Sequence, residues 1–215
     1  MKQRDQLPGE FDLIAHLVKG LRMSPRTILG PGDDCAILAP PRRPQVFTID
    51  SMVEGVHFRL EWGPPEKLGA KALAVNLSDI AAMGATPAAF VINLGVREGL
   101  GMRFFDRLYA GLKQTAAEHH ADLVGGNITR AERLSITVAL LGESSKRILL
   151  RSAAKAGYEA FVTGTLGDSA AGLRILTGSL NAQGAARRFL LERHLNPTPR
   201  IKAGLALARM NPAPA

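Results

Sequence analysis

Four aspartates in the first half of the sequence stand where a carboxylate could bind a metal ion. Asp33 and Asp34 follow the turn sequence GPG and precede the apolar run CAIL. Asp50 ends the apolar run VFTID, and Asp79 interrupts the run AVNLSDIAAMG. Each aspartate alone is more typical of a turn, a helix cap or a structural hydrogen bond. Together they predict a Mg²⁺ site, because converging carboxylates need a cation and Mg²⁺ prefers oxygen ligands, with phosphate completing its shell.

The spacing around Asp79 indicates how such a site could be reached. Leu73, Leu77 and Ile80 fall on one face of the expected helix, and Asp79 falls on an adjacent face. Asp79 is therefore expected at the margin of the core, where its carboxylate could face a cleft. A purely structural, hydrogen-bonded Asp79 stays an open alternative.

Other groups carry weaker signals. The sequence contains no GxxxxGKS or GxxxxGKT motif, and GPGDDC lacks the third glycine and the preceding strand of a Rossmann turn. GTLGDSAAG (164–172) could hold a phosphate at a helix start, but an N-cap at Asp168 or Ser169 explains the same pattern. Cys35 is expected to pack in the core.

The apolar periodicity predicts the elements that would position these residues. Helices are expected at residues 10–21, 66–83, 102–120, 169–176, 185–195 and 199–210. Strands are expected at residues 35–38, 46–50, 88–96, 122–126, 135–142 and 160–164. Residues 1–145 therefore predict an α+β domain of β-β-α-β-α-β type with a mixed or antiparallel sheet. Residues 146–215 predict the start of a second, incomplete α/β domain.

The composition favours a folded cytoplasmic protein. Of the 215 residues 46% are hydrophobic and 21% are charged, which is enough for a core. The start does not resemble a signal peptide, no apolar run has the length of a membrane span, and only one cysteine occurs. We therefore expect no membrane partner and no disulfide within the chain.

The net charge of +8 is concentrated in the last third of the sequence. Residues 1–145 carry 16 basic and 16 acidic side chains, whereas residues 146–215 carry 11 basic and 3 acidic ones. Such a block could bind nucleic acid, phosphorylated small molecules or an acidic protein surface. Because it has few stacking residues and no nucleic-acid motif, we expect no nucleic-acid partner. A solvated helix face is at least as good an explanation.

Seven segments together resemble the bacterial thiamine-monophosphate kinases in order and approximate spacing. They are GEFDLI (9–14), GPGDDCAIL (30–38), TIDSMVEGVHF (48–58), KALAVNLSDIAAMGATP (71–87), RSAAKAG (151–157), VTGTLGDSAAGL (162–173) and RHLNPTPRI (193–201). The resemblance implies membership of the superfamily of aminoimidazole ribonucleotide synthetase, selenophosphate synthetase and a hydrogenase-maturation factor. It implies an N-terminal domain like that of the synthetase, homodimers formed through the N-terminal sheets, and binding of ATP with several Mg²⁺ ions.

The implied activity is the ATP- and Mg²⁺-dependent phosphorylation of thiamine phosphate to thiamine diphosphate. By motif, Asp34, Asp50 and Asp79 resemble the magnesium-binding aspartates. Thr48 resembles a ligating hydroxyl residue. Because a phosphate acceptor is already ionised near neutral pH, such a reaction needs charge neutralisation and alignment rather than a general base.

The resemblance also implies roles for residues that contact the substrates. His57 resembles the histidine that contacts thiamine phosphate, and Arg151 resembles an arginine that contacts ATP. Gly126 and Asn127 match a pair that contacts nucleotide and metal.

Several positions depart from the family pattern. Asn127 stands in place of an aspartate, Ile49 in place of a hydroxyl residue, and Tyr158 where the pair GD is expected. The sequence ends before the segments DLSDGL and GGEDYE, which in the family supply further contacts. Two interpretations stay open: a magnesium-dependent thiamine-phosphate kinase with a shortened chain, or a non-catalytic dimeric paralogue that binds nucleotide or thiamine phosphate.

Overall fold

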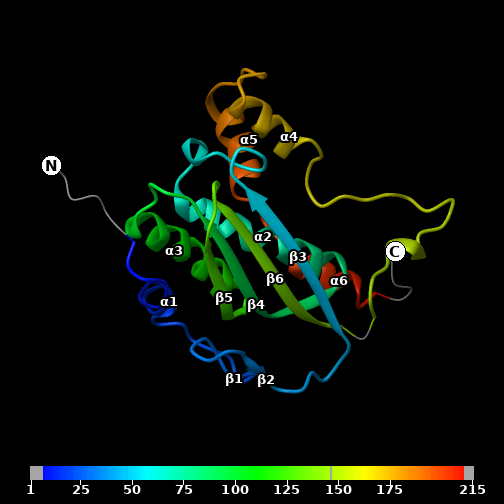
Figure 1. Ribbon diagram of the computed structural model, residues 1–215. Helices are drawn as coiled ribbons and strands as arrows, with labels where there is room; N and C mark the ends of the chain where they lie inside the picture. The colour runs from blue at the N-terminus through cyan, green and yellow to red at the C-terminus, as the bar shows by residue number, and fades with distance from the viewer. Residues whose placement is uncertain (1–6, 146, 211–215) are drawn as a thin grey trace.

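A four-stranded mixed sheet forms the centre of the computed structural model, which describes residues 7–145 and 147–210 (Figure 1). The strand order is β3-β6-β4-β5. β6 (Ser135–Ser144) pairs antiparallel with both β3 (Gln45–Val53) and β4 (Ala85–Val96). β4 pairs parallel with β5 (Asp122–Arg130). The predicted α+β class with a mixed sheet is confirmed, and β3 and β5 are the two edges of that sheet.

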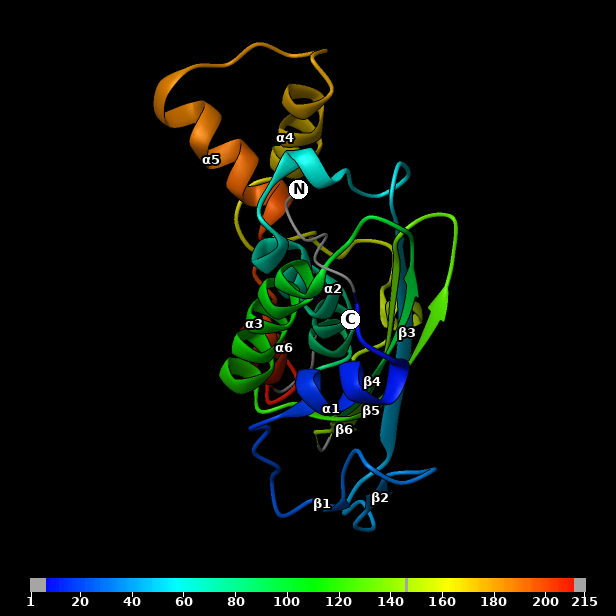
Figure 2. The same cartoon turned by 60° about the vertical axis from the view of Figure 1, so that its left-hand side comes forward.

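Two long helices, α2 (Pro65–Ala82) and α3 (Met102–His119), cover one face of the sheet (Figure 2). The residues of strand β6 alternate strictly between buried and half-buried, which shows that one face of the sheet is covered. Ile136, Val138 and Leu140 are buried and join one core with the apolar sides of both helices. The alternation is the period of two that a strand with one covered face should show.

Glycine lets α2 and α3 approach until their backbones touch. A Cβ atom at Gly69 of α2 would lie 1.9 Å from the carbonyl oxygen of Leu108, and one at Gly111 of α3 would lie 1.9 Å from that of Glu66. No side chain fits such a distance. The crossing therefore fixes where α2, which carries Asp79, lies against the sheet.

The remaining helices lie around the two layers that are formed by the sheet and by helices α2 and α3. α1 (Glu10–Val18) buries Leu13 and Leu17, and the short turns η1 (Leu60–Trp62) and η2 (Arg151–Ala153) lie in connecting segments. α4 (Asp168–Leu176) and α5 (Gly184–Leu195) pack on each other at the top of Figure 1. α6 (Ile201–Leu207) returns to the main body and packs on α2. Among the described residues no helix is long and apolar enough to cross a membrane.

The strand predicted at residues 160–164 is wrong. No strand forms in this segment, which bends at residues 163–164, and Phe161 and Val162 are 86% and 57% exposed. A run of apolar and β-branched residues predicts a strand only where a neighbouring strand supplies hydrogen bonds and a packing surface. The described chain offers no such neighbour here.

The sequence did not predict β1 (Thr27–Leu29), which forms a separate two-stranded sheet with β2 (Ile37–Leu38). A buried carboxylate fixes the segment that leads into β1. Asp122 accepts hydrogen bonds from Ser24 N (3.0 Å), Ser24 Oγ (2.7 Å) and Thr27 Oγ1 (2.6 Å). Cys35, before β2, is exposed rather than packed in the core as expected.

Candidate functional site

Strand β3 directs Thr48 and Asp50 toward the helical side of the sheet. In the β3–β6 register, Thr48 lies opposite Leu140 and Asp50 lies opposite Val138. Directly opposed residues of an antiparallel pair share a face, and both of these β6 residues are buried beneath the helices. Because β3 is an edge strand, Thr48 and Asp50 stand at the rim of the helical layer rather than inside it.

Asp79 meets these residues from α2. Thr48 Oγ1 donates a hydrogen bond of 2.7 Å to Asp79 Oδ2, at a position open to solvent. The pKa of Asp50 is raised above its usual value by burial and by the negative charge of Asp79, against the opposing effect of His57. Asp50 and Asp79 are thus close enough for their charges to interact, and a cation between them would remove that repulsion.

A cleft of about 1250 Å³ opens beside this group. Its walls come from three segments far apart in the sequence: the first half of β3, the second half of α2, and residues 148–152. Thr48, Asp79 and Arg151 all line it. A carboxylate on one wall, that of Asp79, and a guanidinium on another, that of Arg151, are the kinds of group that hold a metal-bound phosphate chain.

The other predicted metal ligands lie elsewhere in the described chain. Asp34 is exposed between β1 and β2, where its backbone N–H donates to Asp33 Oδ1 (2.8 Å). Asn127 is on β5, the opposite edge of the sheet, and its Nδ2 donates to Asn93 Oδ1 (2.9 Å). Within residues 7–145 and 147–210, no three His, Cys, Asp or Glu side chains group closely enough to hold a metal ion.

The residues that were predicted to contact the substrates also lie at separate places in the structure. His57 is exposed in the turn after β3, and its Nδ1 accepts a hydrogen bond of 3.1 Å from Val53 N–H. Gly126 neighbours Asn127 on β5, so this pair is separated from Thr48 by two intervening strands. Ile49, which replaces a hydroxyl residue of the family pattern, is 60% exposed on the other face of β3.

Two features of the structure were not expected from the sequence. The apolar residues Ile148, Leu149 and Leu150 form part of the wall of the cleft, and the only available signal was their position directly before Arg151. At the start of α4 the N-cap is Gly167, and no side chain caps the helix. The expectation that Asp168 or Ser169 caps this helix is therefore wrong.

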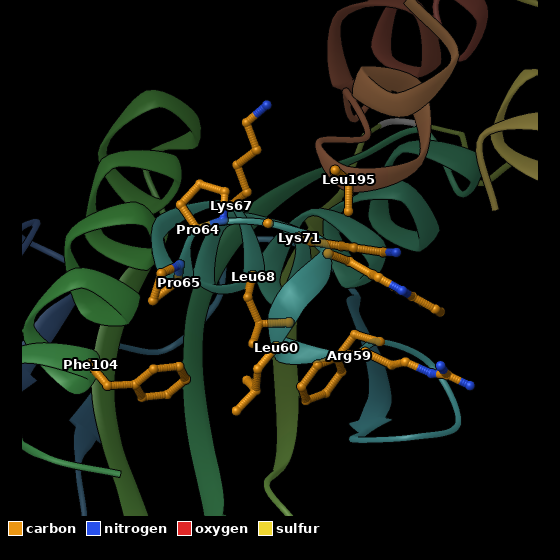
Figure 3. A pocket seen from close by; sticks show the side chains of 12 residues that line it. Arg59, Leu60, Pro64, Pro65, Lys67, Leu68, Lys71, Phe104 and Leu195 are labelled. Atoms are coloured by element: carbon orange, nitrogen blue, oxygen red, sulfur yellow. The ribbon is translucent and has the colours of Figure 1, made fainter. Parts of the chain in front are cut away.

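A second and smaller pocket lies between η1, the start of α2 and the end of α5 (Figure 3). Its volume of about 30 Å³ is too small for a nucleotide. The side chain of Lys71 lines it, and Lys71 Nζ lies 3.4 Å from Nε2 of the buried His194.

His194 joins α5 to α4 as well as to α2. Its Nδ1 lies 3.1 Å from both the carbonyl oxygen and the Oγ of Ser169, and the tautomer with the proton on Nδ1 donates to the carbonyl. Nε2 is then left to accept from Lys71. Burial and the charge of Lys71 lower the pKa of His194, and burial lowers the pKa of Lys71. The contact therefore favours a neutral imidazole.

Comparison with known proteins places these residues in a family. Residues 32–144 match the family described as AIR synthase related protein, N-terminal domain. The chain is 39% identical over 206 residues to the thiamine-monophosphate kinase of Bacillus subtilis, covering 91% of this chain and 62% of the relative.

Solved structures show the same similarity. The thiamine-monophosphate kinase of Stenotrophomonas maltophilia aligns with a TM-score of 0.76 at 36% identity, over 92% of this chain and 63% of the other. The structure described as AaThiL complexed with AMPPCP and TMP aligns with a TM-score of 0.72 at 36% identity, over 94% and 63%.

The chain spans about 62% of the length of the Bacillus subtilis relative. The family match covers the sheet, α2 and α3, and thus includes Thr48, Asp50 and Asp79. The chain therefore belongs to the AIR synthase-related family through its N-terminal domain, and its similar relatives are thiamine-monophosphate kinases.

Proposed function

We propose that this chain forms the magnesium- and nucleotide-binding part of a kinase that converts thiamine phosphate and ATP to thiamine diphosphate and ADP. One observation carries the proposal: Thr48, Asp79 and Arg151 line a single cleft. The relatives supply the reaction, because they are thiamine-monophosphate kinases and one solved structure is described as a complex with AMPPCP and TMP.

Asp79 in the cleft and Asp50 beside it suit one Mg²⁺ ion. Mg²⁺ is commonly held by one or two carboxylates together with substrate phosphates, rather than by a complete protein cage. Asp50 and Asp79 offer two carboxylates, and the raised pKa of Asp50 reflects burial and the nearby charge of Asp79 without a cation. When bound, the ion would neutralise the phosphate charge that otherwise opposes the approach of two anions.

The chain's own residues would then align the reactants. Arg151 would hold phosphate oxygens of ATP through charge-assisted hydrogen bonds, while Thr48 keeps the Asp79 carboxylate in place. The acceptor is itself a phosphate, with a second pKa of about 6, so it is already ionised at neutral pH. Positioning and neutralisation are therefore sufficient, and no side chain has to remove a proton.

We further propose that the protein acts as a homodimer formed through the open face of the sheet. Phe47, Ile49 and Val91 are 67%, 60% and 41% exposed, which leaves apolar surface on strands β3 and β4. Gly126 and Asn127 lie on the sheet edge opposite to Thr48. Closing two sheets about a two-fold axis could set β5 of one protomer near β3 of the other.

Such an arrangement would let Asn127, together with Asp34, contribute to further Mg²⁺ positions. It would also let Gly126 contact ATP, with His57 left to contact thiamine phosphate. The exposed free thiol of Cys35 is compatible with the reducing cytoplasm as the proposed compartment.

The function is tested by measuring ADP formation with ATP, Mg²⁺ and thiamine phosphate, alongside the variant Asp79→Asn. We expect ADP formation that requires both thiamine phosphate and Mg²⁺ and that is lost in the variant. If the protein binds MgATP but forms ADP at the same rate without thiamine phosphate, the assigned acceptor is wrong. If it binds no MgATP, the whole assignment fails.

The dimer is tested separately by light scattering after size exclusion. Ile49→Glu places a charge on the open face, and Leu166→Glu is the matched control because Leu166 is an 81% exposed apolar residue of a loop. We expect a dimer for the native chain and the control, and a monomer for Ile49→Glu. A native monomer would refute the proposed interface.

A further inference from the structure

An ion pair lies at the base of the turn that carries His57, and the proposed function gives it no role. Glu54 and Phe58 lie at the two ends of this turn and form an isolated parallel bridge. Gly55 N–H donates to the carbonyl oxygen of Phe58 (2.8 Å), which closes the turn. Phe58 is buried in the core, whereas His57 is exposed. The turn therefore presents His57 to solvent from an anchored base.

Glu54 ties the start of the turn to two other segments at the same end of the sheet. Its Oε2 accepts hydrogen bonds from Nε of Arg97, directly after β4 (2.8 Å), and from the N–H of Leu134, directly before β6 (3.2 Å). The Glu54 N–H donates to the carbonyl oxygen of Leu134 (2.9 Å). Leu134 is fully buried. Both the backbone and the carboxylate of Glu54 are thus attached to a residue of the core.

The carboxylate of Glu54 is held in its charged form. Burial alone would raise the pKa of Glu54, but hydrogen bonds from Arg97 and Leu134 and the charge of Arg97 lower it. Arg97 is itself oriented, because its Nη1 donates to the carbonyl oxygen of Glu98 (2.8 Å). Hydrogen bonds between charged groups are stronger than those between neutral ones. The ion pair therefore fixes a backbone position three residues before His57.

His57 is held within the turn through its backbone and its ring. Its N–H donates to the carbonyl oxygen of Val53 (2.9 Å), and its Nδ1 accepts from the N–H of Val53 (3.1 Å). Because a backbone N–H only donates, the neutral imidazole carries its proton on Nε2, which can donate to a ligand oxygen. His57 counteracts the rise in the pKa of Asp50, so the ring lies within electrostatic reach of that carboxylate.

From this geometry we propose that Glu54 and Arg97 are positioning residues for thiamine phosphate, because they hold the turn from which His57 Nε2–H donates to a phosphate oxygen. The inference rests on the proposed function, which supplies this ligand. Neither Glu54 nor Arg97 lines the cleft, so their effect on the ligand acts through His57. A donor that is already in place binds more tightly than one that must be ordered on binding.

Hydrogen exchange tests the positioning without any ligand. Arg97→Gln removes the charge that holds Glu54, so the amides of Gly55 and His57 should exchange faster than in the native chain. Arg107→Gln is the matched control, because Arg107 Nε makes a similar contact with a carboxylate, that of Glu66 (2.6 Å), between α3 and α2. The control should leave these two amides as protected as in the native chain. Equal protection in Arg97→Gln would overturn the proposal.

Calorimetric titration of thiamine phosphate into the chain saturated with MgAMPPCP tests the consequence for binding. Arg97→Gln should weaken the affinity for thiamine phosphate by roughly threefold to tenfold, because a displaced donor loses part of one hydrogen bond. Arg97→Lys keeps the charge and should recover most of the affinity. The affinity for MgAMPPCP should stay unchanged in both variants, and Arg107→Gln should bind both ligands as the native chain does.

A double-mutant cycle separates positioning from general support of the fold. If Arg97 acts through His57, adding Arg97→Gln to His57→Ala should cause no further loss of affinity for thiamine phosphate. The same loss in both backgrounds would overturn the proposal, and so would native affinity in Arg97→Gln; either result would leave the proposed function standing. A native chain that binds MgAMPPCP but no thiamine phosphate would refute the assigned acceptor and this inference together.

Discussion

Replacing Thr48 by valine tests whether the hydrogen bond to Asp79 holds in place the carboxylate that we propose to bind the metal. Valine keeps the β-branched shape of threonine and suits a strand, so the substitution removes little besides the hydroxyl. The lost bond is an O–H···O⁻ contact of 2.7 Å between β3 and α2. Hydrogen bonds to charged groups contribute about 1.5–3 kcal/mol when well shielded, and because this contact is exposed we expect about 1 kcal/mol.

A loss of about 1 kcal/mol should lower the melting temperature by about 2–4 °C in a chain of this size. The affinity for MgAMPPCP should also fall severalfold, because the Asp79 carboxylate is no longer oriented. Thr115→Val is the control: its Oγ1 donates to the carbonyl oxygen of Gly111 (3.0 Å) inside α3, away from the cleft. If Thr48→Val binds MgAMPPCP as tightly as Thr115→Val does, the assigned role of the hydrogen bond is refuted.

Three further predictions concern the packing, the pH dependence and the charge of the site. A Cβ atom at Gly204 would lie 2.0 Å from the carbonyl oxygen of Ala81, so Gly204→Ala should cost about 1–3 kcal/mol; an unchanged melting temperature would contradict this. Because the folded pKa of His194 is lowered from 6.5, the unfolded chain binds more protons below that value and stability should fall as the pH falls through it. Urea unfolding at several pH values should show this loss, and His194→Gln should reduce it; equal slopes would refute the effect. Because the folded pKa of Asp50 is raised, its ionised form opposes folding at neutral pH, so Asp50→Asn should melt higher than the native chain in EDTA and gain less from Mg²⁺. A lower melting temperature in EDTA would be evidence against repulsion at this site.

The layer structure could be predicted from the sequence because its signals are local. The helical periodicity around Leu73, Leu77 and Ile80 predicts α2, and all three residues are buried in the core. The apolar content of residues 135–142 likewise predicts β6. These patterns depend only on which face of an element is covered, so no knowledge of distant contacts is required.

Features that depend on distant contacts could not be predicted in the same way. The segment at residues 160–164 has the composition of a strand, but no described strand pairs with it. Asp122 gave no signal of its role, because its hydrogen-bond donors lie 95 and 98 residues earlier in the chain. The contact of Lys71 with His194 joins α2 to α5 and is likewise invisible to local periodicity.

The candidate site was partly predictable for the same reason. Thr48 and Asp50 share a face of β3, and Asp79 lies at the margin of the apolar face of α2. Local spacing in the sequence can indicate both of these positions. The cleft wall that carries Arg151 depends on the path of the chain after β6, and only the motif resemblance pointed to it. Asp34 and Asn127 do not group with Asp79 in the described chain. Their role in metal binding therefore stays a prediction.

The most direct test of the central claim is a calorimetric titration of AMPPCP with and without Mg²⁺ on the native chain and on Asp79→Asn. The matched control is Asp12→Asn, an exposed aspartate of α1 that does not line the cleft. We predict that the native chain and the control bind AMPPCP only with Mg²⁺, and that Asp79→Asn does not bind it under either condition. Equal Mg²⁺-dependent affinity in Asp79→Asn and the control would contradict the assignment of this cleft as the metal–nucleotide site.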